Sequence, residues 1–118
     1  MRVLGLFPHP DDESWAAGAA LAQCAAAGAD VRVVSATRGE AGRDRRGAAR
    51  TPAQLAALRT DELAIACRAL GARLDGFLDL PDGRLADVDR ATVDAAIDAT
   101  LARIAPQVVL TFGADGAY

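Results

Sequence analysis

The feature that most constrains the fold is a regular alternation of short apolar runs with longer segments of helical periodicity. The short runs lack the polar alternation of half-exposed strands, which favours strands buried on both faces. They cover residues 2–7, 31–36, 76–80 and 107–113, and the segments of helical periodicity between them cover 13–28, 53–70 and 88–104. This β-α-β-α-β-α-β order predicts an α/β fold with a parallel, doubly wound sheet and right-handed crossovers.

Helical periodicity and the residues that cap or end a helix define the expected helices. Gly28 and Gly71 follow the first two and are suited to end them. The second helix is expected to bury one face formed by Leu55, Leu58, Ile65, Ala66, Ala69 and Leu70. For the third, Asp87 is the expected N-cap, and the apolar stripe consists of Val93, Ile97, Leu101 and Ile104.

Composition limits the classes of function. The 118 residues suffice for one domain or a piece of one, and the net charge is −3 with both signs interspersed. Aromatic residues make up 4% of the chain, too few for a base-stacking platform, so we expect no nucleic-acid partner. No apolar run approaches the roughly 20 residues that span a bilayer. Cys24 and Cys67 lack metal-site spacing and are expected to be reduced thiols, which fits a cytoplasmic protein.

Carboxylates follow each of the four predicted strands. In sheets of this kind, ligands bind outside the carboxyl ends of the strands. The acidic residues at these ends are Asp11, Asp12 and Glu13 after the first, Glu40 after the second, Asp82 after the third and Asp115 after the fourth. Asp and Gly are also ordinary loop residues, so the three later loops are ambiguous when each is taken alone.

The first loop, "PHPDDE", predicts a cation site. A dinucleotide-binding unit has a glycine-rich loop here, whereas three adjacent carboxylates repel phosphate and need a positive partner. His9 and Asp12 are three residues apart at a strand-to-helix turn, so both can reach one ion. Imidazole with carboxylate suits Zn²⁺ better than Mg²⁺, although a catalytic zinc site usually has three protein ligands. His9 is the only histidine, and a purely structural role for it is the alternative.

The same loop resembles the His-Pro-Asp-Asp-Glu motif of the PIG-L / LmbE-like zinc-dependent de-N-acetylase family. Four later segments are similar to the family in the same order: "TRGEAG" at 37–42, "RTDELAIACRALG" at 59–71, "LDLPDG" at 78–83 and "TFGADGAY" at 111–118. The resemblance implies a Rossmann-like three-layer sandwich with a mostly parallel sheet. It also implies a hydrolase with one Zn²⁺ per active site, which removes an acetyl group from an N-acetylated amino sugar such as an N-acetylglucosamine derivative, or from a related amide.

The resemblance also assigns roles to individual residues. It implies that His9 and Asp12 bind the metal and that Asp11 is the general base. Tyr118 is expected to donate to the oxyanion of the reacting carbonyl. The residues expected to line the sugar pocket are Arg59, Glu40 and Asp82.

The family pattern places a further metal-binding histidine beyond the position of Tyr118. Residues 1–118 are therefore expected to be the N-terminal portion of a single de-N-acetylase-like domain, incomplete at its C-terminus and inactive or nearly so alone. The fourth strand is then an open edge, through which the chain could form a homo-oligomer.

Two alternatives to the hydrolase stay open at this stage. One is a Mg²⁺-dependent phosphotransfer enzyme that uses the Asp11–Asp12 pair, and the other is a non-catalytic or degenerate Rossmann-like binding module. The arginine-rich loop is read either as a solvated loop or as a clamp on an anionic substrate; its arginines are Arg43, Arg45, Arg46 and Arg50. A cysteine or Ser14 nucleophile is disfavoured, because the only histidine is assigned elsewhere and no Gly-x-Ser-x-Gly elbow is present.

Overall fold

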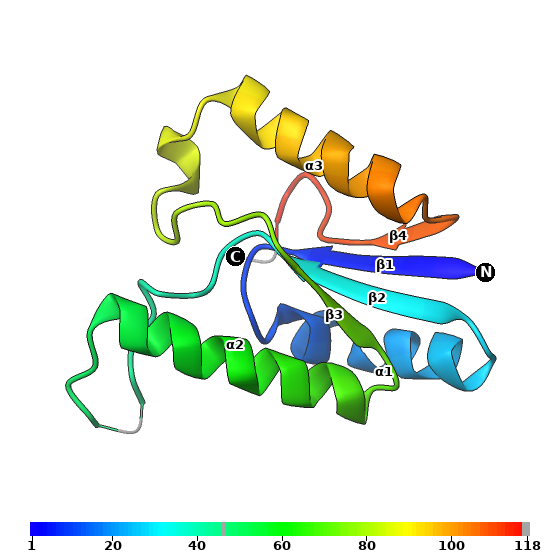
Figure 1. Ribbon diagram of the computed structural model, residues 1–118, viewed down its shortest axis with the longest axis horizontal. Coiled ribbons are helices and arrows are strands. Elements are labelled where there is room, and N and C mark those ends of the chain that lie inside the picture. Colours follow the sequence, from blue (N-terminus) through cyan, green and yellow to red (C-terminus); the bar gives the residue numbers. More distant parts are fainter. Residues whose placement is uncertain (46, 117–118) are drawn as a thin grey trace.

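The computed structural model describes residues 1–45 and 47–116, so the predicted role of Tyr118 lies outside the described residues. The elements follow the predicted order: β1 (Arg2–Phe7), α1 (Asp12–Ala26), β2 (Asp30–Ser35), α2 (Pro52–Ala69), β3 (Arg73–Phe77), η1 (Leu85–Asp87), α3 (Arg90–Ile104) and β4 (Val108–Leu110). The four strands form one parallel sheet in the order β3-β2-β1-β4. Helices α1 and α2 cover one face and α3 covers the other, which confirms the predicted three-layer α/β fold (Figure 1).

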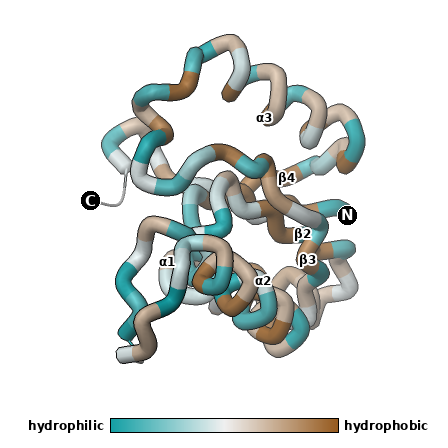
Figure 2. Tube along the Cα trace, turned by 60° about the vertical axis from the view of Figure 1, so that its left-hand side comes forward, coloured by the Kyte–Doolittle hydropathy of each residue, from teal (hydrophilic) through white to brown (hydrophobic). Residues whose placement is uncertain are grey.

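The sheet separates two apolar cores, because successive side chains of a strand point to opposite faces. On the α1 and α2 side, the core includes Val3 and Phe7 of β1, Val31 and Val33 of β2, and Leu21, Leu63 and Cys67 of the helices. On the α3 side, Leu4 and Val34 pack against Ile104. Hydrophobic stretches of the strands lie between the helices in Figure 2. The apolar runs of β1 and β2 are therefore buried on both faces, as their lack of alternation predicted, whereas Val108 and Val109 of the edge strand β4 are 38% and 42% exposed.

Local side-chain bonds fix where the later helices begin. Thr51 and Gln54 form a capping box at the start of α2, and Pro52 occupies the first turn. In α3 the N-cap is Asp89, whose carboxylate accepts a hydrogen bond from Thr92 N at 3.2 Å. The prediction that Asp87 caps this helix is wrong, because Asp87 belongs to the short 3₁₀ helix that precedes it.

Two further expectations differ from the structure. The third strand begins at Arg73 and ends at Phe77, not at 76–80, because a β-bulge against β2 accommodates its charged first half. Ile65 is 58% exposed, whereas α2 buries Leu55, Leu63 and Cys67. The helix therefore packs through a stripe that includes the Leu63–Cys67 pair, and Ile65 lies outside it.

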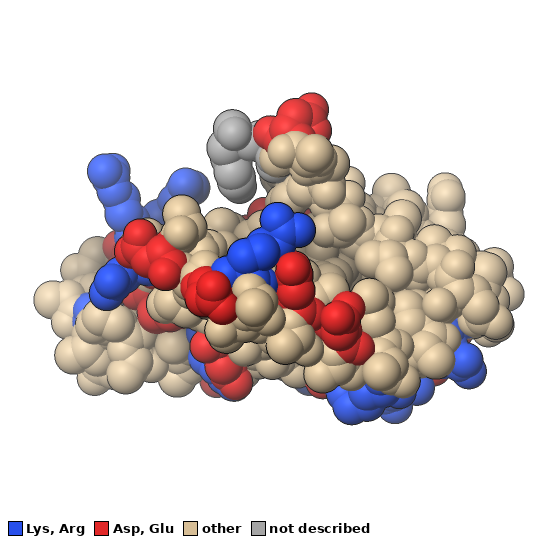
Figure 3. All heavy atoms as spheres, turned by 90° about the horizontal axis from the view of Figure 1, so that it is seen from above, with Lys and Arg blue, Asp and Glu red and all other residues tan. Residues whose placement is uncertain are grey.

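The surface carries both signs of charge. Figure 3 shows acidic side chains next to arginines on the face seen from above, with no broad field of one sign there. Within residues 1–45 and 47–116, no helix is long and apolar enough to cross a membrane. Cys24 and Cys67 are both free thiols, as the sequence predicted.

Candidate active site

Hydrogen bonds join the three loops that follow β1, β2 and β3. The buried Thr37 donates from its backbone nitrogen and from its hydroxyl to the Pro8 carbonyl, each at 3.0 Å. Leu80 N donates to the Ala36 carbonyl at 3.0 Å, which links the third loop to the second. The three loops thus converge at one edge of the sheet, where the sequence predicted a crevice.

The first loop turns sharply at Asp11, which has a φ of 103°, a conformation that favours glycine. The buried carboxylate of Glu13 accepts a hydrogen bond from Asp11 N at 2.9 Å, and the buried carboxylate of Asp12 accepts one from His9 N at 2.9 Å. The side chain of Asp11 is 72% exposed. The turn therefore directs Asp12 inward and leaves Asp11 facing the crevice.

Burial also changes the acidity of Asp12. Removal from water raises the pKa of its carboxyl above the ordinary value, while the hydrogen bond from the His9 backbone acts in the opposite direction. A buried carboxylate of this kind is stabilised in its charged form by a bound cation. Its environment thus agrees with a metal-ligand role.

His9 lies between two carboxylates. Its Nδ1 is 3.5 Å from Oδ2 of Asp12, and its Nε2 is 3.1 Å from Oδ1 of Asp82. Two donors on a tetrahedral zinc ion, each bonded at about 2.0–2.1 Å, are separated by about 3.3 Å. The spacing of Nδ1 and Oδ2 fits that requirement, so the two residues suit one ion of this size. Within residues 1–45 and 47–116, this crevice included, no group of three His, Cys, Asp or Glu side chains is placed to hold a metal.

The second and third loops brace each other through Glu40 and Asp82. Glu40 Oε1 accepts a hydrogen bond from Asp82 N at 2.9 Å, and Asp82 Oδ2 accepts one from Ala41 N at 2.8 Å. The second oxygen of Glu40 accepts from Arg38 N at 3.2 Å. Both carboxylates therefore fix loop geometry around His9.

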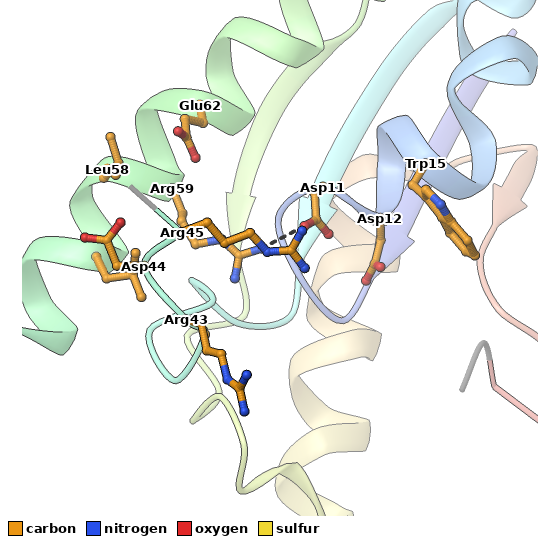
Figure 4. A pocket seen from close by; sticks show the side chains of 11 residues that line it. Asp11, Asp12, Trp15, Arg43, Asp44, Arg45, Leu58, Arg59 and Glu62 are labelled. Carbon is orange, nitrogen blue, oxygen red and sulfur yellow. Dashed lines mark hydrogen bonds and ion pairs between the residues drawn. The ribbon is translucent and has the colours of Figure 1, made fainter. Parts of the chain in front are cut away.

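Arg59 extends from α2 into the crevice and joins the first two loops. Its guanidinium donates to the carbonyls of Gly39, at 3.1 Å, and of Pro10. It also forms an ion pair with Asp11 at 3.1 Å, drawn as a dashed line in Figure 4. Gly39 permits this approach, because a Cβ at that position would lie 2.1 Å from Arg59 Nη1. The guanidinium holds the Asp11 carboxylate in place at the mouth of the crevice.

Comparison with known proteins identifies the family. The profile of the PIG-L family, described as GlcNAc-PI de-N-acetylase, matches residues 4–117. The chain belongs to this family. The match includes the turn that carries His9, Asp11 and Asp12.

Named relatives of this PIG-L chain include deacetylases. A 1D-myo-inositol 2-acetamido-2-deoxy-alpha-D-glucopyranoside deacetylase from Kineococcus radiotolerans is 37% identical over 99% of the chain, and the chain spans 40% of that relative's length. The N,N'-diacetylchitobiose deacetylase from Pyrococcus horikoshii superimposes with a TM-score of 0.81 at 27% identity, covering 92% of this chain and 39% of the other. The 4-carboxy-2-hydroxymuconate hydratase from Pseudomonas putida KT2440 superimposes with a TM-score of 0.77 at 29% identity, covering 92% and 45%.

Most of the predicted site residues lie in one crevice. His9, Asp12 and Asp82 are in contact, Glu40 bonds to Asp82, and Asp11 pairs with Arg59. Within the described part of the chain, Asp115 of the fourth loop makes no hydrogen bond or ion pair with these residues. Sequence reasoning gave no role to Thr37 or Gly39, although both belong to the segment "TRGEAG" that carries the PIG-L resemblance.

Proposed function

We propose that the protein is a metal-dependent hydrolase that removes an acetyl group from an N-acetylglucosamine-containing sugar or a related amide. One observation carries the proposal: in a PIG-L chain, the imidazole of His9 and the carboxylate of Asp12 lie 3.5 Å apart at the crevice edge. Its curated relatives are named deacetylases. The free thiols of Cys24 and Cys67 are consistent with action on a small molecule in the cytoplasm.

We assign His9 and Asp12 as ligands of one Zn²⁺. A bound divalent ion of this kind acts as a Lewis acid, lowering the pKa of water from 15.7 to about 7 and polarising the acetyl carbonyl. Asp82, whose Oδ1 lies 3.1 Å from the far imidazole nitrogen, is the proposed orienting partner of His9. Because the described residues supply two such ligands, we propose that residues 1–118 form the N-terminal portion of a deacetylase domain whose third ligand lies outside them.

Asp11 is the proposed general base. Its exposed carboxylate accepts a proton from the attacking water at Oδ1 or Oδ2 and later donates it to the nitrogen of the leaving amine. Proton transfers of this kind typically contribute about 10²–10⁴-fold to a rate. Arg59 keeps the carboxylate in position through the 3.1 Å ion pair.

We also propose that the sugar is bound by Arg59, Glu40 and Asp82. Tyr118 is the proposed hydrogen-bond donor to the oxyanion. Arg59 is the best placed of the first three, because it lines the open cavity beside Asp11. The oxygens of Glu40 and Asp82 already accept backbone hydrogen bonds, so a sugar hydroxyl would have to share them. A carboxylate oxygen has two acceptor sites, which allows such sharing.

Acetate release in the presence of Zn²⁺ tests the function. The assay uses N-acetylglucosaminyl-inositol with these 118 residues and with a fusion that adds the C-terminal portion of the Kineococcus relative. We expect little acetate from the residues alone and turnover by the fusion, with Asp11→Asn lowering the rate by about 10²–10⁴-fold. A folded, zinc-loaded fusion that releases no acetate, or whose rate is unchanged by Asp11→Asn, would contradict the proposal.

A second candidate is a non-catalytic binding module of the same fold. One observation favours it. Residues 1–45 and 47–116 supply two candidate metal ligands, whereas a catalytic zinc site usually has three. The similarity to a hydratase structure also shows that this fold supports more than one function. Sugar binding without acetate release by the fusion would favour this candidate.

A further inference from the structure

The turn between β1 and α1 contains a third carboxyl group, which the proposed function does not use. Glu13 is 1% exposed, although glutamate is almost never fully buried without a partner. An acidic residue in the first turn of a helix stabilises the helix dipole without being buried. Removing a carboxyl group from water costs free energy unless hydrogen bonds replace the water. The burial of Glu13 therefore points to a specific partner within the turn.

Both carboxyl oxygens of Glu13 are bonded to the turn itself. Oε2 accepts a hydrogen bond from Asp11 N at 2.9 Å, and Oε1 accepts one from the hydroxyl of Ser14. In a capping box, the side chain of the third helical residue bonds back to the backbone N–H of the N-cap. Here the second helical residue does so, because α1 begins at Asp12 and its N-cap is Asp11. Glu13 thus bonds to the backbone of the residue that carries the proposed general base.

The backbone conformation at Asp11 is unusual for an N-cap. Asp11 has a φ of 103° and a ψ of −25°, whereas an N-cap residue ordinarily has an extended backbone. A left-handed conformation is unfavourable for any residue other than glycine. A cavity of about 130 Å³ lies between the turn and α2, so close packing does not hold the turn from that side. The hydrogen bond from Asp11 N to Glu13 is therefore the contact that supports this conformation.

The left-handed backbone keeps the Asp11 carboxylate out of the helix cap. Aspartate is a preferred N-cap residue, because its carboxylate accepts hydrogen bonds from backbone N–H groups of the first turn. The side chain of Asp11 makes no such bond. Its carboxylate is 72% exposed and pairs with Arg59 instead (Figure 4). An extended backbone at Asp11 would allow the carboxylate to cap α1 and would withdraw it from the crevice.

We propose that Glu13 is a positioning residue, which holds Asp11 in the left-handed conformation and so keeps its carboxylate available as the general base. The inference rests on the proposed function and adds a residue to it. When the bond from Asp11 N to Glu13 is lost, the turn relaxes to an ordinary N-cap and the base becomes the cap of α1. Glu13 acts through Asp11 and contacts neither the substrate nor the metal.

The conformation of Asp11 tests the proposal without any need for turnover. In the unchanged 118 residues, nuclear magnetic resonance should show a positive φ at Asp11 and a coupling across the hydrogen bond from Asp11 N to the Glu13 carboxyl carbon. Glu13→Met has a similar size and removes both acceptors, so the φ of Asp11 should become negative. Glu13→Gln retains an acceptor oxygen for Asp11 N and an amide that can donate to the Ser14 hydroxyl, so the positive φ should be kept.

Gln54→Met is the matched control. Gln54 accepts a hydrogen bond from Thr51 N at 2.9 Å, which is the equivalent bond from a helix side chain to the N-cap backbone at the start of α2. Its removal should leave the φ of Asp11 positive. A change at Asp11 in Glu13→Met and not in Gln54→Met assigns the effect to the first turn of α1.

Kinetics of the zinc-loaded fusion test the consequence for the reaction. Glu13→Met should lower kcat by about 10²-fold with little change in KM, because a small displacement of a reacting group is enough for a loss of this size. Glu13→Gln should restore most of kcat, and Gln54→Met should retain it. In an Asp11→Asn background, Glu13→Met should cause no further loss, since residues that act as a unit are not additive. A merely structural role would lower the rate equally in both backgrounds.

Three results would overturn the proposal: a negative φ at Asp11 in the unchanged protein, a positive φ that persists in folded Glu13→Met, or equal rate losses with and without the Asp11 carboxylate. The measurements on the unchanged protein and on Glu13→Gln do not depend on whether Glu13→Met folds.

The proposed function fails separately. If the φ of Asp11 depends on Glu13 but the fusion releases no acetate, the hydrolase is wrong and the hold of Glu13 on the turn stands. If the fusion requires Asp11 and Glu13→Met leaves its rate unchanged, the hydrolase stands and the positioning role is wrong.

Discussion

The Nε2 atom of His9 lies 3.1 Å from Oδ1 of Asp82, on the side of the ring opposite Asp12. If His9 is a metal ligand, as proposed, this contact would orient the imidazole with Nε2 toward Asp82 and Nδ1 toward the ion. Asp82 is itself held by the backbone of Ala41 and by Glu40. The second and third loops therefore contact the side chain that the first loop supplies as a proposed metal ligand.

Asp82→Asn should weaken zinc binding by roughly 10–100-fold, because the outer hydrogen bond partner of a metal-binding histidine orients it and raises its basicity. Competition with a chelating dye measures the affinity. Asp79→Asn is the control, since Asp79 pairs with Arg38 and does not contact His9. Equal zinc affinities in the two variants would show that Asp82 does not position the imidazole.

Gly39→Ala should destabilise the fold more than Gly28→Ala does. Both glycines have positive φ, 70° and 85°, so each substitution incurs a backbone cost of about 1–2 kcal/mol. The new Cβ at position 39 would also displace the Arg59 guanidinium, whereas nothing lies within 4 Å of a Cβ at position 28. Urea unfolding should show an excess loss of about 1–3 kcal/mol for Gly39→Ala. Equal losses would mean that the bonds of Arg59 contribute nothing to stability.

Asp75→Asn should lower the free energy of unfolding by about 1–3 kcal/mol, because it removes the shared partner of three arginines. The mostly buried Asp75 carboxylate lies 3.6 Å from both Arg32 and Arg73 and also pairs with Arg103 of α3. Asp94→Asn breaks an exposed pair with Arg90 and should cost less than about 0.5 kcal/mol. Thermal or urea unfolding compares the two, and similar small losses would show that this network does not tie α3 to the sheet.

Cys67 should make stability fall at alkaline pH. Burial raises the pKa of its thiol from 9.0 to about 12. Between these values the unfolded chain has lost the proton and the folded chain retains it. The contribution of the buried, protonated thiol to the free energy of unfolding is therefore full below pH 9. Above pH 9 it decreases by about 1.4 kcal/mol per pH unit. Urea unfolding from pH 8 to pH 11 should give a shallower decline for Cys67→Ala than for the unchanged protein. Parallel curves would contradict the shifted pKa.

The layer order and the location of the crevice could be predicted from the sequence because both depend on patterns within short segments. Runs such as "VLGLF" are apolar throughout, and the carboxyl ends of parallel strands meet at one edge. The position of His9, Asp11 and Asp12 at this edge could be predicted because they directly follow the first strand. The bounds of β3 were not, since the bulge that places Asp75 among three arginines depends on tertiary contacts.

The connections between loops were also beyond prediction from the sequence. That Arg59 reaches Gly39 and Pro10, or that Glu40 accepts from Asp82 N, depends on how segments about 20 to 50 residues apart pack. Likewise, the periodicity of α2 predicted that Ile65 is buried and did not include Leu63 in the buried face. Apolar residues occur on more than one side of this helix, so periodicity alone does not identify the buried side. Only the position of the sheet decides which side is buried.

The most direct test of the metal site is nuclear magnetic resonance of the single imidazole during zinc titration. His9 is the only histidine, so its ring signals are assigned without ambiguity. Binding at His9 and Asp12 predicts a change in the ring signals that saturates at one Zn²⁺ per chain and is much weakened in Asp12→Asn. Ring signals that stay unchanged as zinc is added, or that respond equally in Asp12→Asn, would contradict the account.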